Sequence, residues 1–138
     1  MKCHVLDANA LYRFLMNQPG ADVVESLFKR SRNGNGNATL LLSVINWGEV
    51  YYNIAVKRGF QEAREFMGQV RLLPLTVVNA DEPITEAAAQ FKAGYGLPYA
   101  DCFAAAITGK ENVLVTADVK DFKKIPWLQI LPLPQHKP

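Results

Sequence analysis

Val5-Leu6-Asp7-Ala8-Asn9 joins a short apolar strand to a helix through an acid. The apolar run from His4 to Leu6 is too short for a helix, and a helical pattern starts directly after the acid. In a parallel α/β sheet, ligands bind in the crevice outside the carboxyl ends of the strands. We therefore expect Asp7 to lie at the edge of the sheet where the chemistry of such folds is usually found.

Strand and helix patterns alternate along the rest of the chain. Apolar runs predict strands at 3–6, 39–42, 112–115 and 128–131, and Pro74 limits 73–78 to a short or edge strand. Helical patterns fill 8–16, 22–32, 43–58, 60–72, 80–93 and 99–108, with a short helical turn at 118–124. The segments 33–37 and 94–98 have the composition of loops. This alternation predicts an α/β fold with a mainly parallel central sheet.

Size and composition predict an ordinary globular protein. The 138 residues suit a single domain, 1–138, and 49% apolar with 20% charged residues rules out a disordered chain. The net charge of +2 does not by itself indicate nucleic-acid binding. The two cysteines have no metal-binding spacing, and no run has the length of a signal peptide or a membrane span. We expect a cytoplasmic protein with reduced cysteines and no membrane contact.

Three further acids stand in settings comparable to that of Asp7. Glu49 falls on the helix that follows the second strand, where Ile45, Tyr52 and Val56 share its face, so the pattern places a carboxylate within an apolar stripe. A carboxylate buried there must be paired, protonated or bound to a cation. Asp101 lies in the first turn of a small-residue helix that can pack close to the sheet, and Asp118 follows the strand at 112–115.

Each acid also has a structural interpretation. Asp7 and Asp118 suit the N-caps of the helices that follow them, and Asp101 suits the positive end of a helix dipole. Taken together, however, the four acids match the oxygen ligands that Mg²⁺ and Mn²⁺ prefer. A cation removes the mutual repulsion of clustered carboxylates and can activate a water molecule for phosphodiester hydrolysis. The reaction class that fits best is metal-dependent cleavage of RNA or DNA.

At these positions the chain resembles the PIN domain family, and within it the small ribonucleases of the VapC toxin type. The matching segments run in family order over about residues 3–131. They are Val5-Leu6-Asp7-Ala8-Asn9, Ser43-Val44-Ile45-Asn46-Trp47-Gly48-Glu49, Pro98-Tyr99-Ala100-Asp101-Cys102-Phe103-Ala104-Ala105-Ala106 and Thr116-Ala117-Asp118-Val119-Lys120-Asp121-Phe122. Two departures are Ala8, where relatives often carry a hydroxyl residue, and Ala117, which replaces the commoner glycine.

The resemblance implies a three-layer α/β/α, Rossmann-like fold and a Mg²⁺- or Mn²⁺-dependent endoribonuclease. By position, Asp7, Glu49, Asp101 and Asp118 would be the catalytic metal ligands, while Asn9, Thr116 and Asp121 would support them. It further implies RNA as substrate, a homodimer, and a small antitoxin whose tail lies across the acid pocket. Two alternatives are a PIN-fold nuclease that acts on DNA or in RNA processing without an antitoxin, and a PIN module that binds RNA or protein without cutting.

Two other phosphoryl-transfer folds share the opening acid but lack partner residues. A haloacid-dehalogenase-type phosphatase needs a second Asp two residues after the first, and this chain has Asn9 there. A phosphorelay receiver domain needs an acidic pair before its phosphoacceptor and a lysine after its last strands, and neither is evident.

The remaining polar and aromatic residues have structural interpretations of equal or greater weight. His4 and Cys102 are expected to pack in the interior. Some basic residues could follow an RNA backbone, although a solvated helix face explains 29–32 equally well. These are Arg13, Lys29, Arg30, Arg32, Lys120, Lys123 and Lys124. Aromatic residues on the two helices at 43–72 suit a core or a subunit interface, with base stacking as a minority option; they are Trp47, Tyr51, Tyr52, Phe60 and Phe66.

Overall fold

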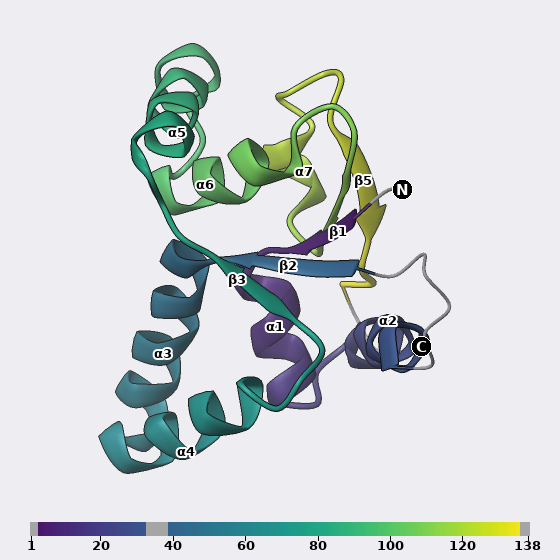
Figure 1. The fold of residues 1–138 in the computed structure, drawn as a ribbon, viewed down its shortest axis with the longest axis vertical. Coiled ribbons are helices and arrows are strands. Elements are labelled where there is room, and N and C mark those ends of the chain that lie inside the picture. Colours follow the sequence, from purple (N-terminus) through teal and green to yellow (C-terminus); the bar gives the residue numbers. More distant parts are fainter. Residues whose placement is uncertain (1–2, 33–38, 136–138) are drawn as a thin grey trace.

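The computed structural model, which describes residues 3–32 and 39–135, contains a five-stranded parallel sheet (Figure 1). The strands are β1 (Cys3–Leu6), β2 (Thr39–Ser43), β3 (Thr76–Val78), β4 (Val113–Thr116) and β5 (Gln129–Pro132). Their order is β3-β2-β1-β4-β5, and every neighbouring pair is parallel. The predicted parallel α/β fold is therefore confirmed, and β3 is the short edge strand that Pro74 indicated.

Seven helices cover the two faces of the sheet in the described ranges (Figure 1). The helices α1 (Ala8–Leu15), α2 (Ala21–Arg32), α3 (Val44–Arg58) and α4 (Phe60–Val70) pack on one face. The helices α5 (Glu82–Tyr95), α6 (Tyr99–Thr108) and α7 (Val119–Phe122) pack on the other. None of the helices in these ranges has the length and apolarity needed to cross a bilayer.

Alternating side chains along the central strands divide the interior into two cores. Leu6 and Val115 belong to the core beneath α1–α4, whereas Val5 and Leu114 belong to the core beneath α5–α7. Successive residues of a strand point to opposite faces, so a strand covered on both sides must be apolar throughout. This explains why Val5-Leu6 of β1 and Val113-Leu114-Val115 of β4 are apolar with no polar alternation.

Element ends differ from the sequence prediction at a few positions. The break expected at 94–98 starts later, because α5 continues through Gly94 and Tyr95 and ends at Gly96, whose φ of +76° suits glycine. Pro132 was expected in an irregular tail, but it closes β5, an edge strand where a missing N–H is tolerated. The loop predicted at 33–37 lies outside the described residues.

Strand order places a topological switch point at the centre of the sheet. From β1 the chain proceeds to β2 and β3 on one side, and then returns to β4 and β5 on the other side of β1. The connections after β1 and β4 therefore leave the sheet in opposite directions, which opens a crevice at the carboxyl ends of these strands. Asp7 follows β1 and Asp118 follows β4, so both acids lie beside this crevice.

Candidate active site: a buried acid cluster

Asp7 is the most buried acid of the site, with a side chain only 3% exposed. Its Oδ1 accepts a hydrogen bond of 2.8 Å from the backbone N–H of Ala10, so it is the N-cap of α1. Its Oδ2 accepts a hydrogen bond of 2.5 Å from the hydroxyl of Thr116. The pKa of Asp7 is nevertheless raised to about 7, mainly by burial and to a smaller extent by the charges of Asp118 and Glu49, while the two hydrogen bonds oppose the shift.

Thr116, the last residue of β4, connects two of the acids. Its hydroxyl donates to Asp7, and the same oxygen accepts a hydrogen bond of 2.9 Å from the backbone N–H of Asp118. Thr116 is fully buried, so this geometry is fixed by the pairing of β1 with β4. The hydroxyl thus holds the carboxylate of Asp7 and the backbone of Asp118 in one orientation.

Glu49 reaches the site from the second turn of α3. The amide Nδ2 of Asn46 donates a hydrogen bond of 2.8 Å to its Oε1, and a second of 3.1 Å to the backbone carbonyl of Ala100. Burial raises the pKa of Glu49, and the bond from Asn46 opposes that shift. Sequence reasoning placed Glu49 in a buried apolar stripe, and this was wrong: Tyr52 and Val56 on that face are 55% and 83% exposed.

Asp101 lies in the first turn of α6, directly after Ala100. The neighbouring Cys102, Ala104 and Ala105 are fully buried, so small side chains let this helix pack closely against the sheet as expected. The pKa of Asp101 is raised to about 7, most strongly by burial and then by the charges of Asp7, Glu49, Asp118 and Asp121. The charge of every other acid of the site therefore disfavours ionisation of Asp101.

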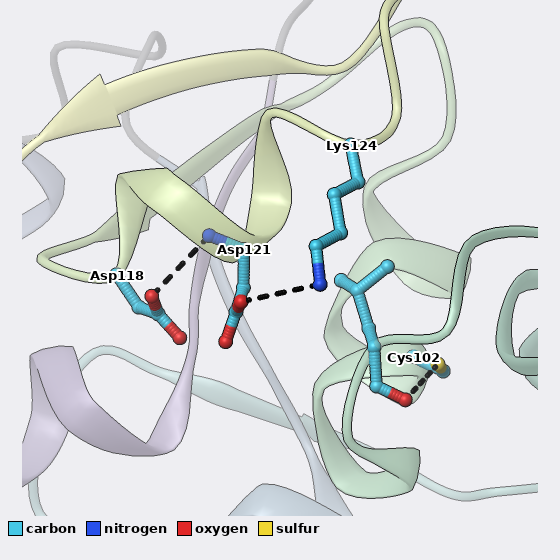
Figure 2. A network of polar contacts seen from close by, with 5 residues as sticks. Cys102, Asp118, Asp121 and Lys124 are labelled. Atoms are coloured by element: carbon cyan, nitrogen blue, oxygen red, sulfur yellow. Dashed lines mark hydrogen bonds and ion pairs between the residues drawn. The ribbon is translucent and has the colours of Figure 1, made fainter.

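Asp118 and Asp121 come from the N-terminus of α7 (Figure 2). The backbone N–H of Asp121 donates a hydrogen bond of 3.4 Å to Oδ1 of Asp118, and the Lys124 ammonium lies 3.5 Å from Oδ1 of Asp121. Burial and the charge of Asp121 raise the pKa of Asp118. In the described part of the chain, one carboxylate oxygen from each of Asp101, Asp118 and Asp121 lies within 4.8 Å of the other two.

Four of these acids, all but Asp121, line one pocket of about 610 Å³ at the carboxyl edge of the sheet. All four predicted ligands line it, as does the exposed Asn9, whereas Thr116 lies buried behind the wall. Asp121, which the sequence predicted as a supporting residue, has a carboxylate oxygen within 4.8 Å of one oxygen each of Asp101 and Asp118. Further lining residues are Ala8, Tyr12, Arg13, Asn53, Ala117, Lys120 and Gln135.

Sequence reasoning missed Asn46 and Asn53. Asn53 is exposed on the pocket wall, two turns along α3 from Asn46. Asn46 stands in the segment that carries Glu49, but a polar residue at that position gives no sign of burial. The signal available in the sequence was the spacing of three between Asn46 and Glu49, which places two side chains next to each other on a helix.

The basic residues separate into two groups. Arg13 and Lys120 line the pocket, and Arg13 donates through Nη1 to the carbonyls of Pro19 and Pro134 at 3.0 and 2.8 Å. Lys29 instead forms an exposed ion pair of 3.1 Å with Glu25 along α2, as expected of a solvated helix face.

Cys102 and His4 were both expected in the interior, but they are buried to different extents. Cys102 is fully buried and its Sγ donates to the carbonyl of Leu97 at 3.8 Å, a contact drawn in Figure 2. His4 is only half-buried.

Comparison with solved structures gives close likenesses of fold at low sequence identity. The DNA-bound VapBC complex from Salmonella typhimurium contains a chain that is 19% identical, with a TM-score of 0.75 over 96% of this chain and 98% of that one. VapBC2 from Rickettsia felis, bound to a fragment of promoter DNA, gives 18% identity and 0.72 over 96% and 99%. FitAcB from Neisseria gonorrhoeae gives 22% and 0.65 over 93% and 96%.

At the level of sequence, the chain matches the sequence model of one protein family. No curated protein sequence matches the chain. The sequence model of the PIN domain matches residues 4–128, which include β4, all of β1 except Cys3, and every acid of the pocket. With the parallel sheet and the fold likenesses above, this match establishes that the chain belongs to the PIN domain family.

Proposed function

We propose that this chain is a Mg²⁺- or Mn²⁺-dependent endoribonuclease and the toxin of a type II toxin–antitoxin pair. The observation that carries the proposal is the convergence of Asp7, Glu49, Asp101 and Asp118 on one pocket at the switch point of the sheet. Membership of the PIN family supports a nuclease, and the fold shared with a chain of a toxin–antitoxin complex supports a toxin.

The electrostatics of the cluster fit a divalent cation. Five acids stand at the site, and only Asp121 forms an ion pair with a basic side chain among the described residues. Burial and mutual repulsion raise the pKa of Asp7 and of Asp101 to about 7, so ionisation of these two side chains is unfavourable in the folded chain. A bound divalent cation reverses that preference, and carboxylate oxygens are the donors that Mg²⁺ and Mn²⁺ take.

Each residue of the site would have a distinct task. Asp7, Glu49, Asp101 and Asp118 would hold the metal, with Asp121 as a further ligand, and Thr116 would keep the Asp7 carboxylate oriented through its hydroxyl. When bound, such an ion lowers the pKa of a water ligand and stabilises negative charge on a phosphodiester. Lys120 and Arg13 on the pocket wall would attract the substrate phosphates toward these acids.

Cleavage of a structured RNA by the purified protein tests this proposal. RNA should be cut with Mn²⁺ or Mg²⁺ and remain intact with chelator, whereas activity that persists in chelator would refute the metal site. Asp7→Asn and Asp101→Asn should each lower the rate by orders of magnitude, because an amide lacks the charge of the missing ligand. A DNA oligonucleotide of the same sequence distinguishes the alternatives: cleavage of DNA alone would favour a DNA nuclease, and cleavage of neither a binding module.

Asp81→Asn is the matched control for these variants. Asp81 caps α5 as Asp7 caps α1, through a hydrogen bond of 3.0 Å from the backbone N–H of Ile84 to its Oδ1. It is exposed and lies outside the pocket. Asp81→Asn should cut RNA at the wild-type rate. If Asp7→Asn alone loses cleavage activity, the cause is damage to the site and not the change of a helix cap.

The proposal includes a homodimer and an antitoxin. Tyr52, Val56 and Phe60 expose 55%, 83% and 73% of their side chains along α3 and at the start of α4, an apolar surface suited to a second copy. A small protein encoded by the neighbouring gene, with a basic residue that reaches the acids, would be the inhibitor. A monomer by light scattering would contradict the dimer, and a neighbouring gene product that neither binds nor inhibits would contradict the antitoxin.

A further inference from the structure

Asn46 joins the two helices that supply Glu49 and Asp101. It is fully buried near the start of α3, and its amide nitrogen donates two hydrogen bonds. Nδ2 donates to Oε1 of Glu49 at 2.8 Å and to the carbonyl of Ala100 at 3.1 Å. Ala100 immediately precedes Asp101 in α6. This one amide group therefore links the side chain of Glu49 on α3 to the backbone of α6 next to Asp101.

Its two partners fix the orientation of this amide. A carboxylate and a carbonyl oxygen can only accept hydrogen bonds, so a flipped amide would place Oδ1 against two acceptors. In the observed orientation Oδ1 is buried and accepts no hydrogen bond from the described residues. A buried acceptor without a partner costs about 1–3 kcal/mol, so an apolar residue of similar size would suit stability better. The two donated bonds are what distinguish asparagine from such a residue at this position.

The position of Asn46 separates it from the substrate. It has no exposed surface and is not among the residues that line the pocket, so it cannot contact RNA. The carbonyl that it holds belongs to the first turn of α6, which rises from one face of the sheet, while Glu49 rises from the helix on the other face. The amide can therefore affect the reaction only through the placement of the acids.

We propose that Asn46 is a positioning residue that sets the separation of the Glu49 and Asp101 carboxylates, and so the affinity of the pocket for a divalent cation. The inference rests on the proposed nuclease function. Residues that orient metal ligands through hydrogen bonds typically contribute tenfold to a hundredfold in metal affinity or activity. Asn46→Leu keeps the volume of the side chain and removes both donated bonds.

Mn²⁺ affinity measured by titration calorimetry on the purified chain is the first readout. Asn46→Leu should weaken Mn²⁺ binding by about tenfold or more and lower kcat by a similar factor, with KM for RNA within about twofold. The metal-free melting temperature should stay near that of the wild type, because the orphaned acceptor is removed together with the donor. Equal Mn²⁺ affinity in the two proteins would overturn the proposal, as would a change confined to KM.

Asn112→Leu is the matched control. Asn112 also uses its amide to connect distant segments: Oδ1 accepts 3.0 Å from the N–H of Cys3, and Nδ2 donates 3.4 Å to the carbonyl of Ile107. It precedes β4 and therefore lies at the opposite edge of the sheet from the acids. Its loss should lower the melting temperature and leave Mn²⁺ affinity unchanged. A loss of affinity equal to that of Asn46→Leu would show a general effect of destabilisation and would overturn the proposal.

A double-mutant cycle identifies the route of the effect. In a Glu49→Ala background the amide has no carboxylate to orient, so adding Asn46→Leu should change Mn²⁺ affinity by less than about threefold. Additive losses would mean that Asn46 acts independently of Glu49, and the inference would fail. If the wild type both binds Mn²⁺ and cuts RNA, such a failure leaves the proposed function intact. If the wild type does neither, both fall together.

Discussion

Replacing Asp7 with asparagine should stabilise the metal-free protein above neutral pH. Asp7 combines the lowest exposure of the acid cluster with a pKa raised from 3.8 to about 7. The unfolded chain releases this proton near pH 3.8, whereas the folded chain holds it until about pH 7. The folded state is therefore favoured at low pH and loses stability as the pH rises between these values. About three pKa units correspond to about 4 kcal/mol, and the full loss is reached above pH 7.

Asparagine carries no proton to lose, so the variant escapes this pH-dependent cost. Its side-chain oxygen can still accept from the backbone N–H of Ala10 and cap α1. The hydroxyl of Thr116 loses its charged acceptor, and this loss cancels about 1 kcal/mol of the stability that the variant gains. The net gain at pH 8 is about 3 kcal/mol, or roughly 9 °C for a chain of this size. At pH 5 the wild type keeps its proton, and the difference should shrink by more than half.

Differential scanning fluorimetry in chelator at pH 5 and pH 8 measures this difference, with Asp81→Asn as the control. The control exchanges an exposed cap of the same geometry outside the pocket and should give no gain at pH 8. If Asp7→Asn melts several degrees below the wild type at both pH values, Asp7 is a structural cap. The electrostatic reasoning for the cluster would then be refuted.

Three further predictions concern the metal, the hydroxyl and the apolar surface. Mn²⁺ at a hundredfold excess over its dissociation constant should stabilise the wild type by about 2.7 kcal/mol, and Asp101→Asn by much less, as read from melting curves with and without metal. Thr116→Val removes both hydroxyl contacts and should lower stability by about 1–3 kcal/mol and RNA cleavage at least about tenfold; wild-type cleavage would show that Asp7 needs no orientation. Val56→Asp, at an 83% exposed position, should convert a dimer to a monomer in analytical ultracentrifugation and leave the melting temperature of the monomer unchanged.

The sequence predicted the elements well where one signal dominated. Continuous apolar runs located β1 and β4, and Ser43 and Gly59 marked the ends of α3, because a cap and a stop are local chemistry. From the residues themselves, the acids could be expected to meet only because a parallel sheet was predicted. A parallel sheet gathers whatever follows its strands at one edge, so Asp7 and Asp118 were expected to meet there.

The errors arose where contacts between elements override a local pattern. The apolar residues Tyr52 and Val56 on α3 indicated a buried face, yet that face lies open to solvent. Asn46 has the residue type of a surface position and is fully buried, because α6 packs over it and supplies an acceptor 54 residues away. Neither fact follows from the periodicity of one helix. Both depend on which helices meet at the carboxyl edge of the sheet.

The hydroxyl bridge between β4 and Asp7 also determines when the site can exist. Thr116 and Asp7 are separated by 109 residues, and their hydrogen bond needs β4 in place beside β1. During synthesis on a ribosome, Asp7 emerges first, and Thr116 of its partner strand follows 109 residues later. A nascent or truncated chain that lacks β4 therefore has no complete pocket, and whatever reaction the pocket performs is withheld until β4 has been made and has paired with β1.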